Sequence, residues 1–312
     1  MRPLRIGVVG LGVISKFYLA AISRLPQVTL AAVCDLRADA LATLLGRVPC
    51  YSSHQVMLGN EGLDAVVVTT PNDTHAAVCR DVLNAGLPVC VEKPLAVSLD
   101  EGRVLDRLAS TLGVPLYTAF HRRHNRNALA LLETSHEAPI VSITARYFER
   151  IEEHIGADTW YLDAGRCGGG CVADNGPNAF DLVRLFLGDV RVTEADVTRD
   201  GQGIDRQAVI ELESEEGATA SVELDWSYPG ERKDLELRFA DGGVARADLL
   251  HGHPGFKNSL WHEYLGITAD FAETVLRRGT AEPVHGGLAA LELVDATYRI
   301  EHAGTRSSTG GK

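Results

Sequence analysis

Residues 4–15 read LRIGVVGLGVIS, an apolar segment that runs directly into a glycine-rich turn. The apolar part predicts a β-strand, and the two glycines that follow predict a tight turn that opens a helix. At such a turn, backbone N–H groups and the positive end of the helix bind a pyrophosphate. Ser15 takes the place of the third glycine of the G-x-G-x-x-G pattern, where a small residue suffices for helix packing. The expected contacts are Gly10, Gly12, Val13 and Ile14.

A glycine turn of this kind also occurs without a ligand, so its neighbours decide the interpretation. Asp35 ends the second predicted strand, where a carboxylate accepts hydrogen bonds from both ribose hydroxyls of NAD and repels the 2′-phosphate of NADP. Arg37 lies close enough along the chain to leave NADP open as a second cofactor. Asp35 is also a good helix N-cap for the following segment. NAD is the expected cofactor, and NADP is the alternative.

Short apolar runs alternate with amphipathic stretches up to Phe120, a pattern that predicts βα units on a parallel sheet. The runs are almost continuous, as expected where helices cover both faces of the sheet. The fold class is therefore α/β, with a doubly wound Rossmann sheet in the amino-terminal domain. The expected strands are Leu4–Gly10, Val28–Asp35, Ala65–Thr70, Pro88–Glu92 and Pro115–Phe120.

Apolar and polar residues alternate in the strands expected after Arg122, which predicts a carboxy-terminal α+β domain with an open, largely antiparallel sheet. The turn at residues 241–243, Asp-Gly-Gly, predicts a hairpin. The expected strands are Ile140–Arg150, Gln207–Glu213, Ala218–Trp226 and Asp234–Ala240, and the expected helices are Asn125–Glu133, Ser259–Arg277 and Gly287–His302. The domain boundaries follow as 1–121 for dinucleotide binding, 122–303 for substrate binding and oligomerisation, and 304–312 for a flexible tail.

Composition narrows the class of partner. The 312 residues are 45% hydrophobic, enough for two cores, and carry a net charge of −12, which argues against nucleic acid. We expect no membrane partner and a cytoplasmic location, because the sequence shows neither a signal peptide nor an apolar run of about 20 residues. The cysteines lie mostly in apolar segments, as reduced thiols do. A small molecule is the expected partner.

Three further motifs complete a recognisable set. Residues 69–75 read TTPNDTH, residues 92–94 read EKP, and residues 168–181 read GGGCVADNGPNAFD. With the glycine turn they resemble the Gfo/Idh/MocA family, the glucose–fructose oxidoreductase and inositol dehydrogenase group, over essentially the whole chain. The resemblance implies that the nicotinamide half of the cofactor is lined by Thr70, Pro71, Asn72 and His75, and that Glu92 helps to hold it.

The resemblance also implies that Lys93 points at the substrate and meets Asp174 at the reactive end of the dinucleotide, so these two are the expected catalytic residues. An ammonium at the carboxyl edge of a parallel sheet lies where ligands bind in such folds, and its charge stabilises a developing alkoxide. A surface lysine that caps a strand end is the alternative for Lys93. For His75 the alternative is a histidine that packs against the turn.

One position departs from the family pattern. Asn178 stands where family members usually carry a histidine that acts as the acid/base, and an amide does not carry a proton at neutral pH. Lys93 is the leading replacement base, because burial and the positive nicotinamide would lower its pKa. Asp174 would then orient the lysine or the substrate hydroxyl. Asn178 itself is expected to bind substrate, and the proton relays that stay open are Tyr161, His121, His124 and His154.

Other residues are candidates for the substrate pocket. Arg122 follows the last Rossmann strand, and either binds substrate or forms an interdomain salt bridge. Trp160 and Tyr161 precede the glycine run, and either stack on a sugar ring or anchor their loop in the core. Asp181 completes the motif and is also expected to bind substrate. No metal site is expected, because Cys167 and Cys171 lack convergent ligands nearby.

The function expected from these features is hydride transfer between a nicotinamide cofactor and a ring carbon of a sugar, nucleotide sugar or cyclitol. Two alternatives stay open because of Asn178. One is an enzyme that retains its cofactor and catalyses epimerisation, elimination or glycoside cleavage. The other is a non-catalytic regulator on the same fold. Family members commonly dimerise through the open face of the second sheet, so the resemblance also implies a homo-dimer or homo-tetramer.

Overall fold

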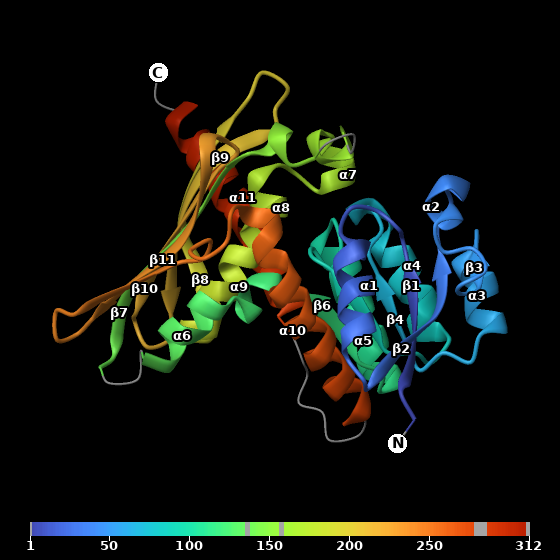
Figure 1. The fold of residues 1–312 in the computed structure, drawn as a ribbon. Coiled ribbons are helices and arrows are strands. Elements are labelled where there is room, and N and C mark those ends of the chain that lie inside the picture. Colours follow the sequence, from blue (N-terminus) through green and yellow to red (C-terminus); the bar gives the residue numbers. More distant parts are fainter. Residues whose placement is uncertain (1, 135–137, 156–158, 278–285, 310–312) are drawn as a thin grey trace. The chain divides into compact units, whose positions relative to one another are not determined.

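In the computed structural model, residues 2–134, 138–155, 159–277 and 286–309 are described. The chain forms two compact units (Figure 1). Unit 1 comprises Met1–His121 and Leu260–Leu288, and unit 2 comprises Arg122–Ser259 and Ala289–Lys312. The division at residue 121 agrees with the boundary expected from the sequence. The assignment of residues 260–288 differs, because the expected second domain ran without interruption to residue 303.

Unit 1 is built on a parallel sheet. Within the described residues, this sheet has six strands in the order β3-β2-β1-β4-β5-β6. Its elements are β1 (Leu4–Val9), α1 (Ser15–Arg24), β2 (Val28–Cys34), α2 (Ala38–Ala42), β3 (Cys50–Tyr51), α3 (His54–Asn60), β4 (Ala65–Val68), α4 (Asn72–Asn84), β5 (Val89–Glu92), α5 (Leu99–Leu112) and β6 (Leu116–Ala119).

The strand order of unit 1 defines where a ligand binds. The chain proceeds from β1 to β2 and β3 on one side, and then crosses back to β4, β5 and β6 on the other. In open parallel sheets, ligands bind beyond the carboxyl ends of the strands at this change of direction. The strands β1, β4 and β5 are buried almost throughout, because Val and Ala side chains on both faces lie under helices. The carboxyl edge at β1 and β4 is therefore the expected cofactor site.

Helix α10 (Phe256–Leu276) explains why unit 1 includes a late segment of the chain. The ring of Tyr264 packs edge-on against Tyr18 of α1, with centroids 4.9 Å apart, and Trp261 packs against Phe17 with centroids 4.5 Å apart. Tyr117 of β6 donates a hydrogen bond to Asp270 at 3.0 Å. These contacts attach α10 to the Rossmann unit. The amphipathic pattern of the helix did not indicate which unit it joins.

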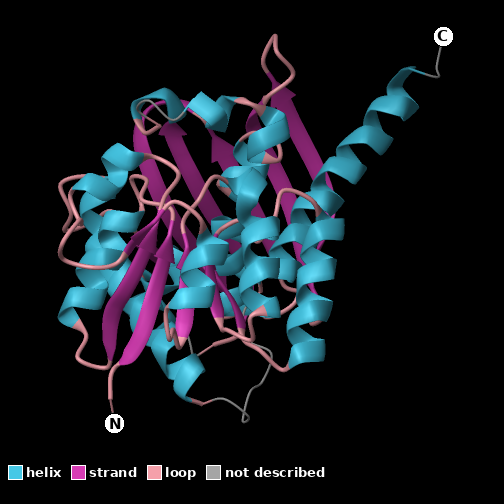
Figure 2. Ribbon diagram, turned by 90° about the vertical axis from the view of Figure 1, so that its right-hand side faces the viewer, coloured by secondary structure: helices cyan, strands magenta, loops and turns pink. Residues whose placement is uncertain are grey.

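Unit 2 combines a second sheet with helices (Figure 2). Within the described residues, the sheet has six strands in the order β12-β11-β7-β10-β9-β8, and only β7 and β10 pair in parallel. Its elements are α6 (Arg126–Thr134), β7 (Ile140–Arg150), η2 (Ile151–Glu153), η3 (Thr159–Leu162), α7 (Ala164–Cys167), α8 (Cys171–Asp174), α9 (Gly176–Leu187), β8 (Val190–Arg199), β9 (Asp205–Ser214), β10 (Thr219–Asp225), β11 (Ser227–Phe239), β12 (Val244–Asp248) and α11 (Gly287–Thr309), and η1 (His121–His124) lies at the unit boundary.

The sheet of unit 2 buries one face, as the alternating sequence predicts. Val222 and Leu224 of β10 are buried, and α8 and α9 pack against the strands on that side. On the other face, Arg146 of β7 pairs with Glu223 of β10 at 3.2 Å across the strands. Arg238 pairs with Glu236 of the same strand at 2.6 Å, and Arg150 pairs with Glu153. The hairpin at Asp-Gly-Gly joins β11 to β12, and is confirmed.

The expected strands and helices are present, most with small shifts at their ends, whereas β11 begins seven residues before the expected Asp234 and α11 ends seven residues after the expected His302. The short β3 and the strands β8 and β12 were not expected. Helix α11 continues through residues 304–309, within the segment expected as a tail, despite their Gly, Ser and Thr content, and the flexibility of that segment stays a prediction. Extending an existing helix by one residue adds a hydrogen bond without a new nucleation cost. No helix in the described part of the chain has the length and apolar content that a bilayer crossing requires.

Candidate functional site

The glycine turn of unit 1 is shaped by the close approach of β4. Gly10 has φ +94°, and a Cβ added to it would lie 2.7 Å from the carbonyl oxygen of Thr69. The hydroxyl of Thr69 donates a hydrogen bond to the Gly10 carbonyl at 2.6 Å. A Cβ on Gly12 would meet open space instead, within an exposed turn. Gly10 is therefore needed for the turn itself, and the open side of Gly12 leaves room for a pyrophosphate. Val13 is exposed, and Ile14 is the N-cap residue of α1.

Asp35 lies beside this turn and bonds to it. Its Oδ2 accepts the backbone N–H of Leu11 at 2.6 Å, and its Oδ1 accepts the backbone N–H of Arg37 at 2.8 Å. The N-cap position of α2 belongs to Arg37, so Asp35 does not cap that helix by its own position. A carboxylate has about four lone-pair sites, which leaves acceptors for two ribose hydroxyls. The Arg37 guanidinium is 58% exposed and lies 3.4 Å from Asp35.

The segment after β4 begins helix α4. Pro71 is the N-cap residue, and Asn72 is the buried first residue of the helix. The ring of His75 is completely buried between two backbone carbonyls, with Nδ1 2.7 Å from the oxygen of Pro94 and Nε2 2.9 Å from that of Thr70. Burial lowers the pKa of His75, and the hydrogen bonds to both carbonyls oppose that change. These contacts favour the alternative of a histidine that packs against the turn, and its cofactor contact stays a prediction.

The end of β5 places Glu92 and Lys93 at the same carboxyl edge. Glu92 is buried, and its Oε1 accepts the hydroxyl of Tyr18 at 2.7 Å. Burial raises the pKa of Tyr18 well above its ordinary value, and the charges of Cys90 and Glu92 raise it further, so the hydroxyl stays protonated and donates. Lys93 is half-buried immediately beyond the strand. Unit 1 therefore presents an ammonium next to an anchored carboxylate.

His121 forms a second buried pair in unit 1. It follows β6, and its Nδ1 lies 2.6 Å from Oε2 of Glu263 on α10. Both side chains are almost completely enclosed, with 5% of His121 and 0% of Glu263 exposed. Because β6 pairs with β5, so that Ala119 is the partner of Glu92, His121 and Lys93 leave neighbouring strands at the same edge. His121 was expected from the sequence as a possible proton relay, whereas Glu263 gave no signal because it lies 142 positions later.

In unit 2, the expected site residues Asp174 and Asn178 lie on helices α8 and α9. Asp174 ends α8 and is 4% exposed, and Asn178 lies in the first turn of α9 and is 2% exposed. Pro177, in the first turn of α9, has no N–H to leave without an acceptor there. The two expected polar residues are thus four positions apart in one buried segment.

The glycines before Asp174 have a structural reason of their own. A Cβ on Gly169 would lie 2.2 Å from the hydroxyl of Tyr298, and a Cβ on Gly170 would lie 2.2 Å from the carbonyl oxygen of Asp205. In the structure, groups of the protein itself lie against them. Cys167 and Cys171 on either side are buried free thiols in the apolar core of unit 2.

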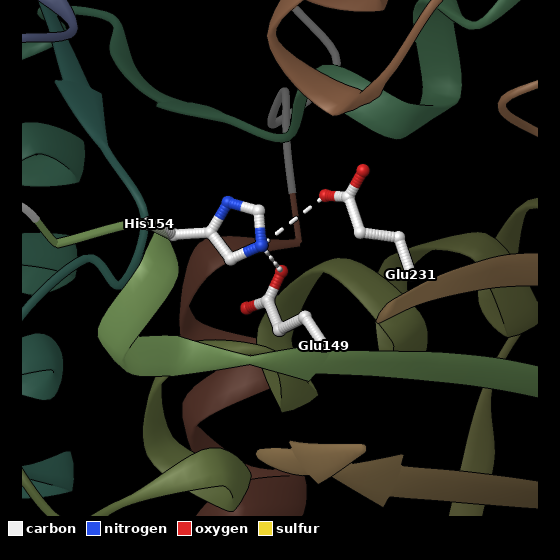
Figure 3. A group of neighbouring side chains, drawn as sticks. All are labelled: Glu149, His154 and Glu231. Atoms are coloured by element: carbon white, nitrogen blue, oxygen red, sulfur yellow. Dashed lines mark ion pairs between the residues drawn. The ribbon is translucent and has the colours of Figure 1, made fainter. Parts of the chain in front are cut away.

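A group of buried charges lies beside this segment. Figure 3 shows His154 directed at the carboxylates of Glu149 and Glu231. Its Nε2 lies 3.9 Å from Glu149 Oε2 and 3.3 Å from Glu231 Oε1. Three such ligands within reach of one another form a candidate metal centre. However, the completely buried ammonium of Lys233 lies 2.6 Å from Glu149 Oε2 and 3.4 Å from Glu231 Oε1. The protein thus supplies its own cation, and Asn175 donates a hydrogen bond to Glu149 at 3.0 Å.

The remaining expected substrate residues have partners within unit 2. Asp181 is 1% exposed, and both of its oxygens accept Arg123, at 2.9 Å and 2.8 Å. Arg122 is completely buried and donates to Tyr147 and Ser259. These contacts account for the burial of both side chains without a substrate, and substrate binding by Asp181 and Arg122 stays a prediction.

Trp160 and Tyr161 lie in the short helix η3 that precedes the glycine run. Their rings stack on each other with centroids 3.8 Å apart. Trp160 is half-buried, and Tyr161 packs partly against the core of unit 2. The packing of Tyr161 fits the alternative in which the aromatic pair anchors its loop. Stacking on a sugar ring stays a prediction.

Comparison with known proteins agrees with the fold of both units. Residues 4–120 match the oxidoreductase family with an NAD-binding Rossmann fold, and residues 106–245 match the GFO/IDH/MocA C-terminal domain. The chain belongs to the Gfo/Idh/MocA family. The resemblance seen in the sequence is thereby confirmed, together with the fold class and the nicotinamide cofactor. This family member is an oxidoreductase with NAD or NADP as its cofactor.

Three relatives show the range of similarity. A D-xylose 1-dehydrogenase (NADP(+)) of Haloferax volcanii is 34% identical over 256 residues, which are 80% of this chain and 75% of that protein. A myo-inositol 2-dehydrogenase of Thermotoga maritima is 30% identical over 190 residues, 60% of this chain and 55% of that protein. The crystal structure of GenD2 from gentamicin A biosynthesis, in complex with NAD, has a TM-score of 0.86 and 25% identity, and covers 97% of this chain and 95% of its own.

Proposed function

We propose that this family member transfers a hydride between the nicotinamide and a ring carbon of a sugar, nucleotide sugar or cyclitol, with Lys93 and Asp174 as its catalytic residues. The observation that carries the proposal is the half-buried ammonium of Lys93 beyond β5, on the sheet edge that also bears the glycine turn and Asp35. The xylose and inositol dehydrogenases among its relatives support a polyhydroxylated substrate.

The residues of unit 1 fit a dinucleotide. The open side of Gly12 admits a pyrophosphate, and the carboxylate of Asp35 keeps acceptors for ribose hydroxyls. When bound, the cofactor accepts or donates the hydride. We propose NAD as the preferred form, because Asp35 repels a 2′-phosphate. NADP binds more weakly, with Arg37 contacting its 2′-phosphate.

The proton is proposed to move through Lys93. In the oxidation direction, the neutral amine takes the proton of the substrate hydroxyl and becomes an ammonium, while the carbon–oxygen single bond becomes a carbonyl. In the reduction direction, the ammonium returns the proton to the forming alkoxide. Asp174 orients the same hydroxyl as a hydrogen-bond acceptor, and Asn178 binds a neighbouring one. The buried pair of His121 and Glu263 supports the role of proton relay at this edge.

Asn178 favours a second candidate, in which the cofactor is reduced only transiently. An amide in place of the family's histidine removes a titratable group from the reacting centre. The net reaction would then be an epimerisation, an elimination or a glycoside cleavage. The experiment that separates the two candidates incubates the enzyme with NAD and a panel of polyols, ketosugars and glycosides in deuterated water. Net reduced nicotinamide supports the dehydrogenase, whereas product with solvent deuterium and no net reduction supports the second candidate.

We also infer that the chain self-associates through the open face of the unit 2 sheet. This face carries charged residues together with the exposed side chains of Val209 and Val244. Sedimentation at micromolar concentration checks the inference, which predicts a dimer or a tetramer. A monomer alone would contradict it.

A further inference from the structure

Asp205, the first residue of β9, is completely buried, and its carboxylate is directed at the backbone before Asp174. Its Oδ1 accepts the N–H of Gly170 at 2.8 Å, and its Oδ2 accepts the N–H of Val172 at 2.8 Å. Val172 is the second residue of α8, where a helix leaves its N–H groups without intrahelical acceptors. Gly170, the N-cap residue, has no side chain to accept them. Asp205 therefore caps α8 from a strand 35 positions further along the chain.

The Asp205 carboxylate is itself fixed. The hydroxyl of Tyr298 donates to Oδ1 at 3.1 Å, and the guanidinium of Arg199 lies 3.5 Å from the same oxygen. Arg199 is held in turn by Glu301 at 2.8 Å. Hydrogen bonds to an ionised acceptor are about twice as strong as those between neutral groups. With donors from α11, β8 and the glycine run, the buried carboxylate is held from several sides.

The other end of α8 is held by a second buried carboxylate. Asn175 directly follows Asp174, and its side-chain amide donates to Oε1 of Glu149 at 3.0 Å. The other oxygen of Glu149 accepts the ammonium of Lys233 at 2.6 Å. Helix α8 spans only four residues, and so short a helix is not stable alone. Its geometry therefore depends on the groups that hold its two ends.

We propose that Asp205 is a positioning residue for the hydride-transfer site: it fixes α8, and with it the carboxylate of Asp174. Asn175 and Glu149 complete the support at the far end. The proposal rests on the proposed function of Asp174. It assigns to the buried Asp205 a role that acts through Asp174 alone, without contact to substrate or cofactor. A displacement of about 1 Å at a reacting group costs on the order of 100-fold in rate.

The test compares Asp205→Asn with Asp196→Asn, the same change at an exposed position of β8. Each is made in the wild-type chain and in an Asp174→Asn chain. We expect Asp205→Asn to lower kcat by about 10- to 100-fold with the Kd for NAD unchanged, and to cause no further loss in the Asp174→Asn chain. Amide hydrogen exchange should accelerate at residues 171–175. In each background, Asp196→Asn should leave kcat, the Kd for NAD and the amide exchange unchanged.

An equal loss of kcat in both backgrounds would overturn the proposal, because a merely structural role does not depend on Asp174. Unchanged exchange at residues 171–175 would overturn it as well, and this readout needs no activity. If wild-type protein turns over no substrate, the proposed function fails while the exchange measurement still decides the positioning. If Asp205→Asn does not fold, Asn175→Ala replaces it, with the same expected dependence on Asp174 and the same contradicting outcomes.

Discussion

The hydroxyl of Tyr18 donates a hydrogen bond of 2.7 Å to Oε1 of Glu92, and so ties the first helix of the Rossmann unit to the strand end that carries Lys93. Glu92 is 7% exposed, which makes this donor costly to remove. A hydrogen bond to a charged group typically contributes about 1.5–3 kcal/mol. The position of Lys93 thus depends on a residue 75 positions earlier in the chain.

Tyr18→Phe should lower the free energy of unfolding by about 1–3 kcal/mol, because Glu92 loses its donor while the ring contacts are kept. Urea unfolding measures this. Tyr51→Phe is the matched control, because it removes a similar hydroxyl-to-carboxylate bond, of 2.9 Å to Glu61, at a partly exposed site. Its effect should be smaller. Equal effects of the two changes would show that burial of Glu92 is not the cause.

Asp35→Ala should shift cofactor preference from NAD towards NADP. The change removes the acceptors for the ribose hydroxyls and the charge that repels a 2′-phosphate, and each hydrogen bond to a charged group contributes about 1.5–3 kcal/mol. Calorimetric titration with each cofactor should show NAD affinity lowered about tenfold or more. Arg37→Ala should weaken NADP and leave NAD nearly unchanged. An unchanged NAD:NADP ratio in Asp35→Ala contradicts the proposed ribose contact.

Glu149 should make the stability of unit 2 depend on acid pH. Burial raises the pKa of this carboxyl, but the charges of Lys233 and His154 and the hydrogen bonds from Lys233 and Asn175 outweigh it and lower the pKa from 4.5 to about 2. A lowered pKa stabilises the folded state above about pH 4.5, and this contribution, roughly 3 kcal/mol, is lost as the pH falls towards 2.

Urea unfolding followed by the fluorescence of the buried Trp226 should therefore show a steep loss of stability between pH 4.5 and 2. Glu149→Gln should remove this part of the pH dependence and lower stability at neutral pH, because Lys233 then lacks its closest partner. Glu216→Gln, at an exposed position, should keep the wild-type profile. If the stability of Glu149→Gln fell as steeply with pH as that of the wild type, another group would be responsible for the pH dependence.

Asn178→His should add a titrating group to the proposed reacting centre. We expect kcat/KM for oxidation to rise about tenfold or more, and to fall again as the pH drops below about 6.5, where the imidazole is protonated and no longer accepts a proton. Asn178→Gln keeps an amide, and its kcat/KM should show no such fall at low pH. A pH–rate profile unchanged by Asn178→His would place Asn178 away from the reacting hydroxyl.

The Rossmann unit was predictable because its signals are local. A glycine or a polar residue ends or directly follows β1, β2, β4 and β5, so the sequence from the glycine turn to Glu92-Lys93 predicted both the sheet and the edge of the proposed site. Helix α10 was expected in the second domain, because an apolar helix face does not identify the core that it joins. The contacts of Trp261, Tyr264 and Asp270 place it on unit 1.

The buried charges of unit 2 left a weaker signal. Lys233 is in phase with the buried Leu235 and Leu237, and Glu149 is in phase with Ala145 and Tyr147, so opposite charges on inward positions of two strands hinted at a pair. Their diagonal contact depends on the register in which Glu231 pairs with Glu149, which alternation alone does not fix. Asp205 lies before the alternating residues Gln207–Glu213 that predicted this strand, so the sequence pattern did not indicate that it is buried.

Steady-state hydride transfer in Lys93→Met tests whether Lys93 carries the proton. The reaction is followed by the absorbance of reduced nicotinamide with the best polyol or ketosugar found for the wild type. Lys257→Met, at an exposed position, is the control. We expect Lys93→Met to keep its affinity for NAD in calorimetry and to lose kcat by about 100-fold or more, because the removed group carries the proton. Wild-type turnover in Lys93→Met would contradict it.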